Sequence, residues 1–176
     1  MSNGTASMSV CVGKQLVCIK LAGRANFQCS VHFKTLIHSL SEKGHSRFVI
    51  DVTECQLMDS TFLGVLAALA LRFCPQADST CEGRLELLNP SERIYDMLDN
   101  LGIAGLFHVL KDSVPTGDFT PVNAPDVVPD RKETAKTCLD AHRLLMELNP
   151  ANESKFKDVA RFLEEDLQRL EKKIQP

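Results

Sequence analysis

Aromatic side chains are scarce in this chain of 176 residues, which has no tryptophan, one tyrosine and nine phenylalanines. A surface that binds nucleic-acid bases normally offers more aromatic rings for stacking. The net charge of −3 also provides no positive field for a polyanion. We therefore expect no direct binding of nucleic acid.

Long apolar runs are also lacking. The longest, residues 62–71, has about half the length needed to span a bilayer. Residues 1–7 show neither the positive cluster nor the apolar core of a signal peptide. These absences predict a cytoplasmic protein that does not insert into a membrane.

Cysteine pairs of the C-x-x-C type are absent, although the chain has seven cysteines. Metal sites and redox motifs usually contain such pairs, so we expect neither a metal nor another cofactor. Most of the cysteines lie within apolar patterns, where a reduced cysteine behaves as a small hydrophobic residue. We therefore predict that all seven are reduced and structural: Cys11, Cys18, Cys29, Cys55, Cys74, Cys81 and Cys138.

Recognisable catalytic motifs are missing too. The chain contains no G-x-S-x-G, P-loop or H-E-x-x-H sequence. A cysteine nucleophile would need a base that the fold places beside it, and this alternative stays open. We expect a protein without enzymatic activity. Its histidines are scattered: His32, His38, His45, His108 and His142.

Regular periodicities are what the sequence does contain. Short runs with alternating or continuous apolar residues predict strands, and apolar residues at helical spacing predict helices. Their order along the chain is β-β-α-β-α-β-α-β, which predicts one α/β domain with helices covering a mixed sheet. The expected strands are residues 8–12, 15–21, 48–52, 84–88 and 106–110, and the expected helices follow Asn26, Ser60 and Asn89.

The remaining third of the chain has a different composition. Prolines recur through residues 113–129, which predicts an extended linker after the domain at 8–112. Residues 130–176 are densely charged and carry apolar stripes on either side of Pro150, which predicts a helical hairpin separable from the domain. The sequence leaves two placements open for this hairpin. It either folds back on the domain or pairs with a second copy in a homodimer.

The most informative stretch connects the predicted strand at 48–52 to the apolar helix that follows. It ends in Met58-Asp59-Ser60, directly before that helix. A buried strand, a short loop and an Asp-Ser dipeptide in this order resemble the signature of anti-sigma factor antagonists and of the wider STAS family. Residues 102–107 also look like the family's ending before its last strand. The resemblance covers about residues 8–112, and it departs from many relatives at Thr61-Phe62, where they have serine or threonine followed by glycine.

The resemblance implies a regulatory binding module. Ser60 would be phosphorylated by an anti-sigma factor of the serine-kinase type and reset by a phosphatase. The unphosphorylated chain would bind the kinase and free a sigma factor, and phosphorylation would release the kinase. The alternative function is a non-catalytic STAS subunit of a larger assembly, such as a lipid-transport complex or a stressosome-like scaffold. The residues expected to contact the partner are Asp59, Thr61, Phe62 and Asp51.

The chemistry of a helix start is compatible with a phosphoserine at position 60. Unpaired amide groups and the positive end of the helix dipole favour an anion there. Asp59 and Ser60 are equally the residue types that only cap a helix. Asp51 is expected near a strand end, either as a second acid of the same loop or as a solvated turn residue. Phe62 is expected to be exposed because first-turn side chains lie nearest the loop.

Overall fold

A computed structural model describes residues 6–75, 83–112, 117–122 and 129–172. The observed order of elements in the first 110 residues confirms the predicted β-β-α-β-α-β-α-β order. The strands are β1 (Ser7–Val12), β2 (Val17–Ala25), β3 (Arg47–Met58), β4 (Arg84–Leu88), β5 (His108–Leu110) and β6 (Thr120–Pro121). The helices are α1 (Phe27–Glu42), α2 (Ser60–Phe73), α3 (Glu92–Asn100), α4 (Arg131–Leu148) and α5 (Glu153–Lys172), with 3-10 turns η1 (Ala104–Leu106) and η2 (Pro150–Asn152).

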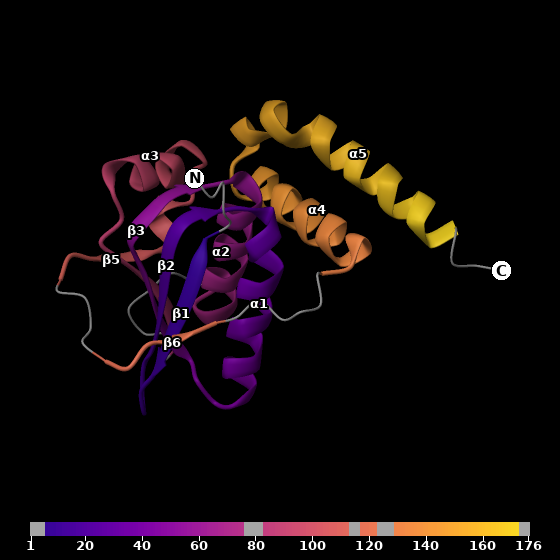
Figure 1. Cartoon of the computed structure of the whole chain (residues 1–176). Helices are drawn as coiled ribbons and strands as arrows, with labels where there is room; N and C mark the ends of the chain where they lie inside the picture. The colour runs from indigo at the N-terminus through magenta and orange to yellow at the C-terminus, as the bar shows by residue number, and fades with distance from the viewer. Residues whose placement is uncertain (1–5, 76–82, 113–116, 123–128, 173–176) are drawn as a thin grey trace.

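The strands of the described ranges form one mixed sheet, in the order β5-β4-β3-β2-β1-β6 (Figure 1). The four strands from β2 to β5 are parallel to one another, whereas β1 is antiparallel to both of its neighbours. Because parallel strands share a direction, β2 and β3 end at the same edge of the sheet. The helices α1 and α2 begin at that edge, directly after these strands.

The hydrophobic core lies on one face of this sheet. Alternate positions of the central strands point into it, and Ile19, Ile50 and Leu87 are 0% exposed. They form one cluster with Phe33 of α1 and Leu98 of α3. This arrangement confirms the predicted architecture of a mixed sheet covered by helices.

The opposite face of the sheet carries a second, smaller apolar cluster. Cys18, Val49 and Leu88 form a small separate cluster there, and Phe119 packs against it. Phe119 precedes β6, which pairs with β1 at the edge opposite β5. The expected linker at 113–129 therefore contains a strand of the same sheet.

The helix α4 packs against α2, so the first of the two placements left open by the sequence is the observed one (Figure 1). Gly64 in the middle of α2 permits the close approach, because a Cβ at that position would lie 2.6 Å from the Ala141 Cβ. Ala141 and Leu145 of α4 belong to the same core cluster as the sheet. The interior of the domain thus includes part of the predicted hairpin.

The turn of the hairpin is fixed to the end of α3. Asn152 is 0% exposed, and its Nδ2 donates hydrogen bonds to the carbonyls of Leu101 (2.9 Å) and Leu145 (2.8 Å). Lys155 Nζ also donates to the Asn100 carbonyl at 3.2 Å. A buried amide that satisfies two carbonyls is costly to remove, so this turn holds α4 in place.

Two local expectations were wrong. The strand β3 continues to Met58 rather than ending near residue 52, because its last residues pair with β2 across two register shifts. Cys74 is disulfide-bonded, whereas Cys11, Cys18, Cys29, Cys55 and Cys138 are free. The seven cysteines are therefore not all reduced in this structure, and Cys81 lies outside the described residues.

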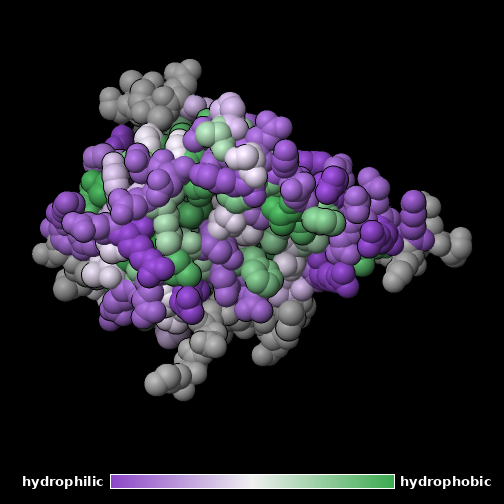
Figure 2. Space-filling view, turned by 90° about the horizontal axis from the view of Figure 1, so that it is seen from above, coloured by the Kyte–Doolittle hydropathy of each residue, from purple (hydrophilic) through white to green (hydrophobic). Residues whose placement is uncertain are grey.

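The surface seen in Figure 2 is mostly hydrophilic, with hydrophobic residues in small separate patches. Within the described ranges, no helix combines the length and the apolar character needed to cross a membrane. The same ranges contain no group of three or more His, Cys, Asp or Glu side chains placed to hold a metal ion.

Candidate functional site at the start of α2

Asp59 connects the starts of two helices. Its Oδ1 accepts a hydrogen bond from the Phe62 amide at 2.8 Å and caps α2. Its Oδ2 accepts from the Phe27 amide, the first residue of α1, at 2.7 Å. The Asp59 amide donates in turn to the Ala25 carbonyl at 2.9 Å. One carboxylate therefore satisfies two helix starts at the edge where β2 and β3 end.

Ser60 is the first residue of α2 and is half-buried. Its hydroxyl oxygen lies 2.8 Å from Nε2 of His142, which belongs to α4 and is 82 positions further along the chain. The predicted helix start at Ser60 is confirmed. Its hydroxyl is held by the C-terminal hairpin.

His142 is 6% exposed, and its ring packs at a tilt against Phe156 with centroids 4.9 Å apart. Its Nδ1 is buried without a hydrogen-bond partner. Burial lowers the pKa of His142 from its ordinary value of 6.5, and the Cys138 carbonyl and Asp59 oppose this shift less strongly. The imidazole is therefore mainly neutral at pH 7, and its Nε2 either accepts a hydrogen bond from the Ser60 hydroxyl or donates one to it, according to the tautomer.

The expected exposure of Phe62 was wrong. Its ring is 0% exposed and packs on Phe33 of α1, with centroids 5.0 Å apart. Because Asp59 ties the starts of α1 and α2 together, the first turn of α2 faces α1 rather than solvent. Thr61 is also buried, at 4% exposure.

Asp51 does not belong to this group of residues, and both expectations for it were wrong. It lies within β3 and is 0% exposed, between the core residues Ile50 and Val52. Successive strand residues point to opposite faces, so Asp51 points away from α2. Its Oδ1 accepts hydrogen bonds from the amide (3.0 Å) and the hydroxyl (2.6 Å) of Thr53, and its Oδ2 has no partner.

His142 is the residue of this site that sequence reasoning missed. The helical spacing of the apolar residues predicts that it points inward from α4, and it does so. The periodicity of one helix does not tell which other helix it meets. The small residues Gly64 and Ala141 are the available signal, because close helix packing needs small side chains on both helices.

A mixed sheet, an Asp-Ser helix start and helices on one face define an α/β domain of a specific type. The model of the STAS domain family matches residues 9–116. The chain belongs to the STAS domain family. The matched range includes Asp59 and Ser60, whereas α4 and α5 lie beyond it. A comparison with curated protein sequences gives no match.

One solved structure, with a TM-score of 0.50, shows the same fold, and two further similar structures give slightly lower scores. The structure of the anti-sigma factor antagonist SpoIIAA in its unphosphorylated form superposes with a TM-score of 0.50 at 18% identity, over 61% of this chain and 90% of that one. An anti-sigma factor antagonist from Mycobacterium paratuberculosis gives 0.49 at 13% identity, over 60% and 85%. The Bacillus cell fate determinant SpoIIAA in the phosphorylated form gives 0.48 at 19% identity, over 61% and 93%.

Proposed function

We propose that this chain is an anti-sigma factor antagonist whose binding to an anti-sigma factor kinase is switched by phosphorylation of Ser60. The observation that carries the proposal is the position of Ser60, at the start of an apolar helix and beside an Asp that caps two helices. The STAS family match supports the same role. A phosphatase would reset the switch, and the chain itself would be a non-catalytic cytoplasmic module.

The charges around Ser60 are compatible with a phosphoryl group that is added and later removed. The positive ends of α1 and α2 meet at Asp59, since each donates an amide hydrogen to it. A phosphoryl group on Ser60 would add about −1.5 to −2 charge beside this carboxylate. The helix ends offset part of that charge within the domain. A partner docked on the same surface would have to desolvate it unpaired, which costs about 3 to 4 kcal/mol.

The switch involves α4 as well, because His142 holds the Ser60 hydroxyl. Phosphoryl transfer needs this hydroxyl to leave Nε2 and face the kinase. A kinase therefore competes with α4 for the first turn of α2. Replacing His142 by alanine removes the competing hydrogen bond, so His142→Ala should be phosphorylated faster than the native chain. An equal or lower rate in a variant with native melting would contradict this part of the proposal.

The first experiment maps the modified residue. The purified chain is incubated with candidate anti-sigma factor kinases and ATP, and the product is analysed by mass spectrometry. We expect one phosphate on Ser60 and none in Ser60→Ala. Ser91→Ala is the matched control, because Ser91 is also a serine that caps a helix and it is exposed. Phosphate on Ser91, or on another residue in place of Ser60, would overturn the assignment.

The second experiment measures partner binding. Ser60→Ala should bind the kinase constitutively, and phosphorylated chain should bind some hundred- to thousandfold more weakly, in line with about 3 to 4 kcal/mol. Ser60→Asp should also bind weakly, although one carboxylate carries less charge than phosphate. Calorimetric titrations give the affinities, and thermal melts check that each variant is folded. Equal affinities for the two variants would exclude the switch.

A scaffold subunit is the second candidate function, and one observation favours it. The helices α4 and α5 lie beyond the family match, and α4 covers the side of α2 that carries Ser60. A scaffold would bind its partners with the same affinity whether or not Ser60 is phosphorylated. Light scattering of the purified chain would also show whether it forms the homodimer, or a larger assembly, by itself.

A further inference from the structure

We propose that a pocket between α1, α2 and α4 binds a small organic anion with an apolar body, of the size of an aromatic or short-chain carboxylate. The pocket has a volume of about 220 Å³. A cavity of about 150 Å³ accommodates benzene, and pockets for drug-sized ligands begin near 300 Å³. The volume therefore suits one ring, or a short alkyl chain, with one acidic substituent.

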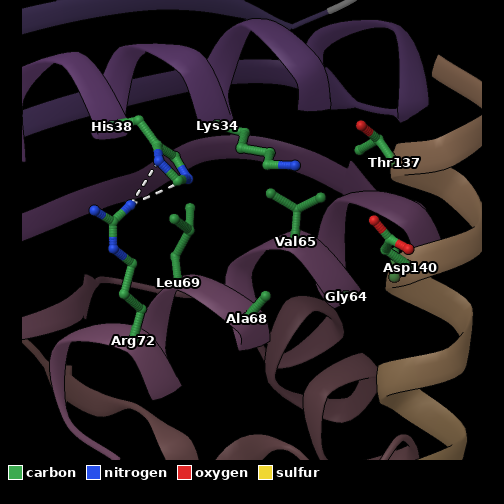
Figure 3. Close-up of a pocket in the computed structure, with 10 residues that line it drawn as sticks. Lys34, His38, Gly64, Val65, Ala68, Leu69, Arg72, Thr137 and Asp140 are labelled. Atoms are coloured by element: carbon green, nitrogen blue, oxygen red, sulfur yellow. Dashed lines mark hydrogen bonds between the residues drawn. The ribbon is translucent and has the colours of Figure 1, made fainter. Parts of the chain in front are cut away.

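The floor of the pocket is apolar and comes from α2. Val65, Ala68 and Leu69 point into it, and the contact between Gly64 and Ala141 closes one end (Figure 3). Because Gly64 has no side chain, the two helices meet there and then leave a gap further along α2. An apolar body in this gap would be shielded from water by helices on both sides.

The other end of the pocket is cationic. Arg72 donates a hydrogen bond to Nδ1 of His38 at 2.6 Å at this end, and the Lys34 side chain of α1 extends over Val65, away from Arg72 (Figure 3). Burial, and then the charges of Arg72 and Lys34, lower the pKa of His38. Among the described residues, neither Arg72 nor Lys34 has a carboxylate within salt-bridge distance. Two cations without a carboxylate partner in the described ranges provide the charge that an acid group requires.

The acidic side chain of the pocket determines the orientation of the ligand. Asp140 of α4 lies at the end opposite Arg72, and its Oδ2 accepts a hydrogen bond from Lys136 at 3.0 Å (Figure 3). The acid group of the ligand would therefore lie between Arg72 and Lys34, and its apolar body would extend along α2 toward Gly64. A bound ligand would contact α4 as well as α1 and α2, so binding should stabilise the docked position of α4. This inference holds whether or not Ser60 is phosphorylated.

Titration of the full chain with benzoate and hexanoate tests the site, with calorimetry as the readout. We expect saturable binding of both acids, and binding at least tenfold weaker for benzyl alcohol, hexanol and inorganic phosphate. Arg72→Gln and Lys34→Gln should each weaken acid binding about tenfold, because each removes one charged contact. Ala68→Leu should abolish binding by filling the pocket from an exposed helix position. Lys43→Gln is the matched control, since Lys43 is exposed at the end of α1 and should leave binding unchanged.

Hydrogen exchange provides a second readout that does not depend on phosphorylation. Saturating benzoate should slow amide exchange in α4 more than in α5. Absence of acid binding by natively folded protein would overturn the proposal. So would unchanged binding by Ala68→Leu with a native melt, or inorganic phosphate that binds as tightly as the acids.

Discussion

The two helices of the C-terminal hairpin differ in how they attach to the molecule. The helix α4 buries six of its 18 residues, whereas α5 buries only Ala160 among its 20. Phe162 of α5 remains 61% exposed and Val159 38% exposed. Helices that form one hairpin in sequence therefore differ in role. α4 completes the core and reaches Ser60, and α5 covers α4.

Side-chain size accounts for this difference. The small residue Ala141 lets α4 approach the domain closely, because it lies directly over Gly64. The attachment of α5 to α4 relies more on ion pairs at the surface, such as Arg131 with Asp166 at 2.9 Å and Arg143 with Glu164 at 2.8 Å. Exposed ion pairs contribute little to stability, so α5 should be the less firmly held of the two helices.

Truncation of the chain should show the largest difference between the contributions of α4 and α5 to stability. A chain that ends at residue 128 lacks α4 and exposes the apolar side of α2, so we expect loss of the cooperative melting transition. A chain that ends at residue 152 keeps α4 and the Asn152 anchor and should melt cooperatively at a lower temperature. Calorimetry or circular dichroism distinguishes these outcomes. Cooperative, near-native melting of the shorter chain would instead support the separable hairpin predicted from the sequence.

Single substitutions should show the same difference between α4 and α5, with smaller changes in the free energy of unfolding. Leu145→Ala should lower the free energy of unfolding by about 2 to 5 kcal/mol, because the side chain is 0% exposed in the core. Phe162→Ala should change it by less than about 0.5 kcal/mol, because the ring is mostly solvated. Urea denaturation measures both. Sedimentation of Phe162→Ala also tests the homodimer, since a lost dimer would show that the exposed ring is an interface.

The pH dependence of stability should depend on α4. The pKa of His142 is lowered on folding, so the unfolded chain binds a proton at a higher pH than the folded chain does. The contribution of His142 to the free energy of unfolding is fully present above the unfolded pKa near 6.5. It is lost as the pH decreases toward the pKa of the folded state. The slope is at most about 1.4 kcal/mol per pH unit for one proton. His142→Gln should flatten the denaturation profile below pH 6.5.

His38 is the control for that measurement. Its pKa is also lowered, by burial first and then by Arg72 and Lys34, so it contributes with the same sign. Since His38 is less buried than His142, His38→Gln should flatten the profile less. An unchanged profile in His142→Gln would show that its burial does not persist in solution.

The smallest effect should come from the ion pairs that join α5 to α4. A double-mutant cycle on Arg131→Ala and Asp166→Ala should give a coupling free energy of about 0.2 to 1 kcal/mol, reduced further by salt. Arg131 is 71% exposed in this pair, which accounts for the low value. A coupling well above 1 kcal/mol would mean that α5 is held as firmly as α4.

Local features of the chain could be predicted from the sequence because their causes are local. Strand alternation and helical spacing depend on neighbouring residues, and the Asp59 cap needs only amides of the first turn of α2. The order of elements and the helix start at Ser60 follow from these signals. The resemblance to the STAS family rested on the same stretch.

The tertiary structure determined which distant residues these local features contact. Phe62 is buried because Asp59 also caps α1, a contact over 32 positions that no periodicity contains. Asp51 lies inside a strand rather than near its end because β3 continues to Met58 by pairing with β2. His142 reaches Ser60 because Gly64 and Ala141 let α2 and α4 pack closely, across 82 positions of sequence between the bonded residues. The sequence by itself determined the elements and the serine at the helix start, whereas the packing of distant segments determined which side chains surround that serine.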